Sequence, residues 1–457
     1  MTAQSSVDPA AQRSWLSPFF IGLAVAVTIP GVILRFVHPG WSPSLLALIF
    51  GIAVVGAAFA LSWAAEVAEL DIGQGLAIAI LALVAVLPEY AVDAILAWKA
   101  GDDPDQFAPL ATANMTGANR LLLGLGWSTV VFIFVFQKAR RRGPKEERVL
   151  RLEPSQAIEV VFLGIATIYS FVLPLKGNIA LYDFAFLFLV FVAYTVRLSK
   201  AEHDEPFLVG PAAWIGARSI SGRRAFAIAL FLVAAGAIFA AAEPFAEALV
   251  ETGESFNIDE FLLLQWVAPL ASETPEFLIA ILYTIRNRPT AGMGTLVSSK
   301  VNQWTLLIGT LPLVFAISAG SLGVFPLVAE QREEVFLTAA QSLFGVAIIV
   351  TLSVSMFEAF LLAGLFFVQF ATGLVLEQLE RGGTISPQYA DDVNLWVRVG
   401  LGCFYLLLAF GILWRQRRYL GPLIRVAFAR GSEVAVAGGA FDEEAHGSTP
   451  AAGPPGS

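Results

Sequence analysis

Two stretches, Leu87-Pro88-Glu89-Tyr90 and Thr274-Pro275-Glu276-Phe277, each place a proline and a carboxylate in the middle of a long apolar segment. A carboxylate at that depth in a bilayer is costly, so it indicates a functional site. Proline removes a backbone donor, so we expect both prolines to mark helix breaks. Carbonyl groups freed beside an acid form an oxygen-rich niche for a hard cation. The sequence therefore predicts two niches in which the glutamates are the metal-binding groups.

The composition is that of a polytopic membrane protein. Of its 457 residues 57% are hydrophobic and only 14% are charged, and a globular core does not need so many long apolar runs. A net charge of −9 argues against nucleic-acid binding. With one cysteine and three histidines, the chain predicts no internal disulfide and no histidine-ligated zinc or haem in the membrane. The polar N-terminus predicts no cleaved signal peptide.

About twelve apolar runs are long enough to cross a bilayer. They fall near 18–36, 44–66, 74–98, 107–136, 155–173, 178–197, 225–249, 258–285, 292–319, 334–352, 355–376 and 394–416. Loops rich in Lys and Arg mark the cytoplasmic side and lie around 138–151, 197–224, 286–288 and 415–430, whereas the opposite loops are acidic. With twelve spans every such loop falls on its expected side, and both termini are cytoplasmic.

Features of the first half recur in the second. Asn119 lies 30 residues after the first of the two glutamates, and Asn302 lies 26 residues after the second. The equivalent elements are separated by an odd number of spans, so the two copies cross the membrane in opposite directions. Inverted repeats with interrupted helices are typical of secondary transporters, with the ion site at the repeat interface. We predict an all-α polytopic membrane protein with two inverted five-helix repeats containing broken helices, plus one extra helix at each end.

The predicted organisation follows from these repeats. Its parts are an N-terminal tail with an extra transmembrane helix (1–43), the first repeat half (44–197), a cytoplasmic linker (198–224), the second, inverted half (225–376), an extra C-terminal transmembrane helix with a basic segment (377–430), and a tail expected to be disordered (431–457). The linker is too short to hold a separate calcium-sensing domain.

The signature residues carry a family resemblance. Leu87-Pro88-Glu89 followed by Asn114-Met115-Thr116-Gly117-Ala118-Asn119 resembles the first signature repeat of the cation/calcium exchanger superfamily, which includes sodium/calcium exchangers. Thr274-Pro275-Glu276 followed by Ser298, Ser299 and Asn302 resembles the second. The resemblance covers about residues 44–376. It implies ten core helices whose central carboxylates bind sodium, calcium or protons in alternation. It also implies that both asparagines are side-chain carbonyl ligands or supports of the helix breaks.

Other polar residues lie beside these motifs. Glu273 is expected either to bind an ion or to pair with Lys300, whose ammonium could instead take the place of a monovalent cation. For Arg120 a buried salt bridge that fixes helix packing is the simpler reading. Asp93 lies one helical turn after the first glutamate and could extend the pathway. The full set of candidate cation-binding residues is Glu89, Glu276, Glu273, Asn119, Asn302, Asn114, Ser272, Ser298 and Ser299, with Pro88 and Pro275 as helix breaks.

These features predict a secondary-active antiporter resembling the sodium/calcium exchangers. It would exchange Ca²⁺ or Na⁺ against Na⁺ or H⁺ by alternating access, because a bound passenger neutralises the paired glutamates before the site crosses the low-dielectric barrier. A sodium/proton antiporter without calcium transport is the alternative, and an intramembrane enzyme is a remote one, since no nucleophile–base motif is present. The expected partners are inorganic cations and the bilayer of a prokaryotic inner membrane. No further cofactor is expected, and the sequence does not indicate an oligomeric state.

Overall fold

The computed structural model describes residues 16–37, 39–68, 70–71, 87–142, 149–200, 208–256 and 260–429, with only the backbone for 141–142. The first part of the third predicted span (74–86), part of the predicted linker (201–207), residues 1–15 of the predicted N-terminal tail and the whole predicted C-terminal tail (431–457) lie outside the described residues.

Nine helical runs in the described part of the chain are long and apolar enough to cross a membrane. A helix satisfies all its backbone groups internally, which lipid requires. The runs are α2 (Leu16–Leu34), α3 (Pro43–Ala68), α6 (Pro104–Leu121) continued by η1 (Leu122–Trp127) and α7 (Ser128–Arg142), η2 (Pro154–Gln156) with α8 (Ala157–Ser170) and α9 (Val172–Lys176), α10 (Leu181–Leu198), α12 (Ile220–Phe256), α14 (Pro289–Asn302) continued by η3 (Gln303–Leu307) and α15 (Ile308–Ser318), α17 (Met356–Arg381), and α18 (Pro387–Phe428).

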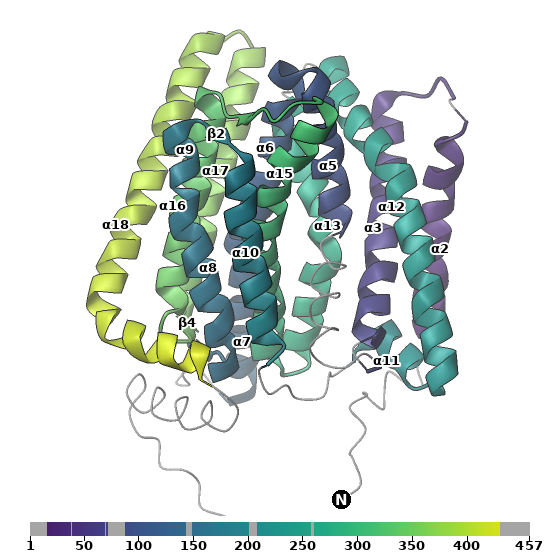
Figure 1. Cartoon of the computed structure of the whole chain (residues 1–457), viewed down its shortest axis with the longest axis vertical. Helices are drawn as coiled ribbons and strands as arrows, with labels where there is room; N and C mark the ends of the chain where they lie inside the picture. Colours follow the sequence, from purple (N-terminus) through teal and green to yellow (C-terminus); the bar gives the residue numbers. More distant parts are fainter. Residues whose placement is uncertain are drawn as a thin grey trace, which may run out of the picture.

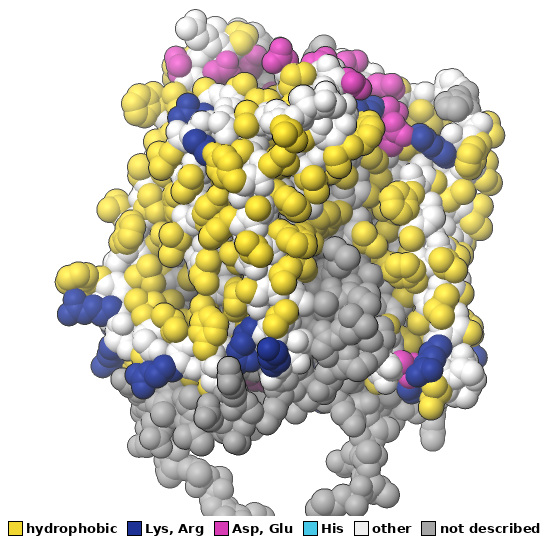
Figure 2. Space-filling view, viewed as in Figure 1, with side chains coloured by type: hydrophobic (Ala, Val, Ile, Leu, Met, Phe, Trp, Pro, Cys, Tyr) yellow, Lys and Arg dark blue, Asp and Glu magenta, His cyan; other side chains and the backbone are white. Residues whose placement is uncertain are grey.

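The other predicted spans correspond to helices that carry more charge or are described only in part. They are α5 (Leu87–Asp102), α13 (Glu260–Ile285) and α16 (Ala329–Ile349). A short helix, α11 (Gly210–Gly216), lies in the predicted linker. The long helices run side by side as one bundle, in which α5 and α13 lie among the others (Figure 1). Figure 2 shows apolar side chains over the middle of the bundle, Asp and Glu along one edge, and most of the Lys and Arg along the opposite edge.

In the described residues the buried apolar side chains form two clusters. The smaller cluster joins α2, α3, α11 and α12, and three of these helices stand together at the side of the bundle (Figure 1). Arg35, directly after α2, pairs with Glu243 of α12 at 2.7 Å. Asp71, beyond the end of α3, accepts two hydrogen bonds from Arg223, and these bonds lower the pKa of Asp71. Ion pairs therefore connect α12 to its neighbours in its first turn and again in its second half.

Two short antiparallel ladders connect the halves of the chain. β1 (Val149–Arg151), just before η2 and α8, pairs with β4 (Ser353–Ser355), just before α17. β2 (Asn178–Ile179), just before α10, pairs with β3 (Phe325–Pro326), just before α16. The two ladders lie at opposite ends of the bundle (Figure 1). Each ladder thus joins one connection from the first half to one from the second.

The helix irregularities differ from those that the sequence predicts. α13 runs from Glu260 to Ile285 without a break, so the predicted helix break at Pro275 is wrong. Proline costs a helix one hydrogen bond but is tolerated where neighbouring helices enclose the freed carbonyl group. Pro88 lies in the first turn of α5, where a missing N–H costs little, and the residues before Leu87 are outside the described part. The interruptions occur instead as the π-helical segments η1 and η3.

Candidate functional site

Carboxyl groups from two helices meet inside the bundle. Glu89, in the first turn of α5, is only 3% exposed, and its Oε1 has no hydrogen-bond partner. Glu273 of α13 is fully buried, and its carboxyl group is within hydrogen-bonding reach of that of Glu89. Glu276, one turn further along α13, lies close enough to interact with Glu89 electrostatically. The structure therefore brings together the three acids that the sequence singled out.

Polar groups from the same and neighbouring helices surround these acids. Ser272 of α13 lies close to Glu89, and its hydroxyl donates to backbone oxygens one turn earlier in its own helix. The side-chain amide of Gln303, the first residue of η3, donates to Oε1 of Glu273. Oε2 of Glu273 and Oε2 of Glu276 are buried without a hydrogen-bond partner. Buried carboxylates without a bonded counter-charge need a cation or protons to neutralise them.

The acids do not form a ready-made metal cage. Among the described residues, no three His, Cys, Asp or Glu side chains are grouped closely enough to hold a metal ion. A hard cation such as Ca²⁺ takes six to eight oxygen ligands. Hydroxyl, amide and backbone carbonyl oxygens would therefore have to complete the coordination.

Lys300 binds an asparagine instead of a carboxylate. Its fully buried Nζ donates to Oδ1 of Asn119 at 2.8 Å and to the backbone oxygen of Asn119 at 3.1 Å. The ammonium also lies 4.5 Å from the centre of the Trp304 ring. The ion pair with Glu273 that the sequence offered is absent from the described residues. The side-chain carbonyl of Asn119, predicted as a cation ligand, is thus already occupied by a cationic side chain.

The remaining predicted ligands are distributed around this centre. Asn302 is buried at the end of α14, directly before η3. The Ser298 hydroxyl lies 2.9 Å from the Tyr194 hydroxyl of α10, and Ser299 is buried. Asn114 donates to Oδ1 of Asp93 at 2.7 Å, which leaves Asp93 Oδ2 and Asn114 Oδ1 buried without partners. Asn114 therefore belongs to a second polar pair, one turn along α5 from the acids.

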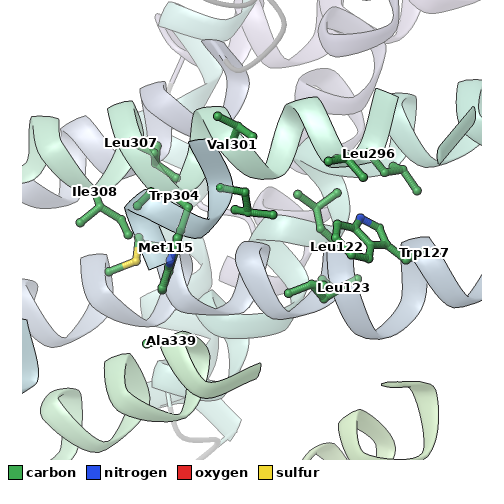
Figure 3. Close-up of a cluster of buried hydrophobic side chains, with 14 of the residues drawn as sticks. Met115, Leu122, Leu123, Trp127, Leu296, Val301, Trp304, Leu307, Ile308 and Ala339 are labelled. Carbon is green, nitrogen blue, oxygen red and sulfur yellow. The ribbon is translucent and has the colours of Figure 1, made fainter. Parts of the chain in front are cut away.

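An apolar cluster encloses the helices that carry the asparagines. Figure 3 shows Leu122, Leu123 and Trp127 packed with Leu296 and Val301, and all five side chains are buried. The first three belong to η1, and the last two belong to α14. π-Helical turns are frequent at functional sites. Both π segments follow closely on the predicted asparagines, so the irregular backbone lies where the two signature copies face each other.

The comparison with known families decides what kind of protein this is. The sequence model described as "Sodium/calcium exchanger protein" matches residues 41–200 and 226–374, which is well over half of the chain. The chain belongs to the sodium/calcium exchanger family. It is therefore a membrane cation exchanger that works by antiport and not an enzyme, which removes the intramembrane enzyme that the sequence left as a remote alternative.

One solved structure supports this assignment, and two others are more distantly similar. The exchanger is 40% identical to the protein of "Crystal Structure of H+/Ca2+ Exchanger CAX", with a TM-score of 0.80 and coverage of 90% of this chain and 98% of that one. It is similar in fold to native YfkE, with 16% identity, a TM-score of 0.53 and coverage of 77% and 97%. A structure of the sodium-calcium exchanger NCX_Mj matches at 14% identity and a TM-score of 0.46, with coverage of 76% and 99%. No curated protein matches the exchanger.

A second buried ionic group of the exchanger links three helices. Arg120 of α6 and Glu334 of α16 form an ion pair of 2.5 Å, and their side chains are 0% and 1% exposed. The other oxygen of Glu334 lies 2.8 Å from Nε of Arg398 on α18, which also pairs with Glu330 at 2.8 Å. The structural reading of Arg120 is confirmed. The sequence did not single out Glu334 or Arg398, because charges near the ends of spans are ordinarily solvated.

Gly117 sets the distance between the two helices that carry the site. A Cβ atom at this position of α6 would lie 1.8 Å from the backbone oxygen of Gln265 on α13. We expect Gly117→Ala to push α6 away from α13, to lower the free energy of unfolding by about 1–3 kcal/mol and to reduce transport. Thermal unfolding in detergent and flux measurements test this.

Gly236→Ala provides the matched control, because a Cβ at Gly236 of α12 meets nothing within 4 Å. It should leave both quantities close to wild type. Equal stability of the two variants would contradict the close approach of α6 and α13.

Proposed function

We propose that the exchanger moves Ca²⁺ in one direction and H⁺ in the other through the site formed by Glu89, Glu273 and Glu276. The observation that carries this proposal is the cluster of buried carboxyl groups without a bonded counter-charge. The 40% identity to an H+/Ca2+ exchanger over nearly its whole length supports Ca²⁺ and H⁺ as the passengers.

The mechanism follows from the charge of the site. Either one Ca²⁺ or two protons can discharge two of the three carboxyl groups while the third stays protonated, and an uncompensated pair of charges is costly to hold away from water. The loaded site can therefore switch from one side of the membrane to the other, whereas the empty ionised site cannot. Ser272 is a proposed hydroxyl ligand beside Glu89, and Gln303 orients Glu273 through its hydrogen bond. Asn302, Ser298, Ser299 and Asn114 remain proposed ligands, and Asn119 is proposed to act through Lys300.

Cations would reach the site through an acidic mouth. A cavity of about 600 Å³ lies at one end of the bundle between α6, α13 and α18, among other helices. Its acidic lining residues are Asp105, Glu254, Glu260, Glu330, Glu377, Glu380 and Asp391. A concave surface lined by one sign of charge raises the local concentration of the opposite ion. This mouth favours a cation as the passenger but does not select between Ca²⁺ and Na⁺.

We also propose the finer organisation of the chain. Twelve spans, two inverted five-helix halves at 44–197 and 225–376, and one extra helix at each end account for the described helices. The family match in two segments supports the division into halves, as does the crosswise pairing of β1 with β4 and of β2 with β3. The basic and acidic edges in Figure 2 support cytoplasmic termini in a prokaryotic inner membrane.

A flux experiment tests which two ions are exchanged. The purified full chain is reconstituted into vesicles, and gradients of Ca²⁺, Na⁺, K⁺ and H⁺ are imposed one at a time. We expect a pH gradient to drive Ca²⁺ uptake, and a Ca²⁺ gradient to drive H⁺ movement in return, without Na⁺ or K⁺. A Na⁺ gradient that moves H⁺ while Ca²⁺ stays still would overturn the proposal in favour of sodium/proton antiport. If Ca²⁺ uptake requires Na⁺, then Na⁺ is the counter-ion in place of H⁺.

A further inference from the structure

A second cavity lies far from the acids, at the basic end of α18. It has a volume of about 540 Å³ and is bounded by the connection between α16 and α17, by the first turns of α17 and by the residues from Leu408 to Tyr419 of α18. In Figure 1, α18 bends and its last part runs crosswise along the base of the bundle, at the edge where Figure 2 shows Lys and Arg. The cavity therefore opens where a bilayer would meet water.

One end of this cavity is suited to an anion. Arg415 and Arg418 line it. Arg418 donates to the Tyr419 hydroxyl, whereas Arg415 makes no hydrogen bond or ion pair with any described residue. The hydroxyls of Thr351 and Ser353, 2.9 Å apart, lie on the opposite wall. Gln416, also in the lining, is a further amide group that contributes to the polar wall.

The one carboxylate in the lining offsets only part of this charge. Oε2 of Glu358 accepts hydrogen bonds of 2.7 Å from both the backbone N–H and the hydroxyl of Ser355. Glu358 is thus the third residue of a capping box at the start of α17, where the helix dipole favours a negative charge. The lining therefore keeps a net positive charge, with two arginines against one glutamate.

The other end of the cavity is apolar and continuous with the lipid-facing surface. Leu361, Leu408 and Ile412 form this wall. Phe357 beside them is 71% exposed, and Trp414 at the same level of α18 is 73% exposed. Tryptophan is enriched at membrane–water interfaces, where its ring lies at headgroup depth. A ligand that fills this cavity needs an anionic group joined to a hydrocarbon chain.

We propose that the cavity binds one anionic phospholipid, with its phosphate between Arg415 and Arg418 and an acyl chain along Leu361, Leu408 and Ile412. A zwitterionic headgroup would bring its own ammonium against these guanidinium groups, so a lipid of net negative charge is favoured. The lipid would bridge α17 and α18 and hold the end of α18 in place. This inference is independent of which ions the exchanger transports.

Native mass spectrometry of the full chain tests the proposal. The protein is stripped of lipid in detergent and titrated with phosphatidylglycerol or phosphatidylcholine. We expect phosphatidylglycerol to bind in preference and to raise the unfolding temperature. Replacing both Arg415 and Arg418 with Gln should weaken its binding about 30-fold, since each basic residue near an anionic lipid contributes a separate electrostatic increment.

Arg417→Gln is the matched control, because Arg417 lies between the two arginines in sequence but stacks on Trp414 and does not line the cavity. It should change the affinity by less than about threefold. Leu361→Trp, which fills the apolar end without changing charge, should also weaken lipid binding, and it keeps the test valid if the double variant does not fold. An equal loss in Arg417→Gln, equal binding of phosphatidylcholine, or displacement of the lipid by inorganic phosphate alone would overturn the proposal.

Discussion

Glu89→Gln is expected to reduce Ca²⁺ uptake by at least about 100-fold, since loss of even an outer partner of a bound cation costs about 10–100-fold. The amide keeps the shape of the side chain, but it carries no charge for Ca²⁺ to neutralise and cannot release a proton. The amount of protein inserted into the membrane should remain at the wild-type level. Ca²⁺ uptake driven by a pH gradient, measured per reconstituted protein, gives the result.

Glu243→Gln serves as the control for this variant. Glu243 is also a carboxylate on a membrane-spanning helix, but it already pairs with Arg35 at 2.7 Å and therefore needs no passenger. We expect it to retain most of the wild-type rate. Wild-type uptake in Glu89→Gln, or equal loss in both variants, would contradict the assignment of Glu89 to the transport site.

Glu334→Gln is expected to have the largest effect on stability. The carboxylate lies between two guanidinium groups, at 2.5 Å from Arg120 and 2.8 Å from Arg398. Removing one partner of a buried ionic group leaves the others uncompensated and lowers the free energy of unfolding by about 3–5 kcal/mol. Thermal unfolding in detergent should therefore occur at a clearly lower temperature than in the wild type.

A neighbouring variant separates this effect from a general loss of charge. Glu330 pairs with the same Arg398 but is 47% exposed, so Glu330→Gln should cost less than about 1 kcal/mol. The double variant in which Met replaces Arg120 and Leu replaces Glu334 should recover part of the loss, since an apolar pair avoids the desolvation of both charges. If Glu334→Gln were as stable as Glu330→Gln, the buried group would have no structural role.

The positions that the sequence located correctly are those where one residue is anomalous in its own segment. A carboxylate in the middle of an apolar run has few explanations, so Glu89 and Glu276 could be placed together from the pattern alone; their role as cation ligands stays a prediction. The long apolar runs likewise identified an all-α membrane protein. These inferences need no knowledge of how the helices pack.

The features that the sequence missed depend on distances between helices. Lys300 has carboxylates and carbonyls within reach on several segments, and only packing selects Asn119. Gln303 follows a predicted ligand directly, but its contact with Glu273 depends on the π turn that begins there. Pro275 was expected to break α13, yet the enclosing helices allow the helix to continue. Tertiary contacts decided each of these points against the local pattern.

The crosswise ladders limit how the molecule can move. The pairing of β1 with β4 and of β2 with β3 connects α8, α10, α16 and α17 near both membrane faces. These four helices are therefore expected to behave as one rigid frame. Three of the helices outside these ladders, α2, α3 and α12, contribute to the small apolar cluster as well as to the large one. We therefore expect α2, α3 and α12 to slide along this stationary frame when the site opens to either side of the membrane.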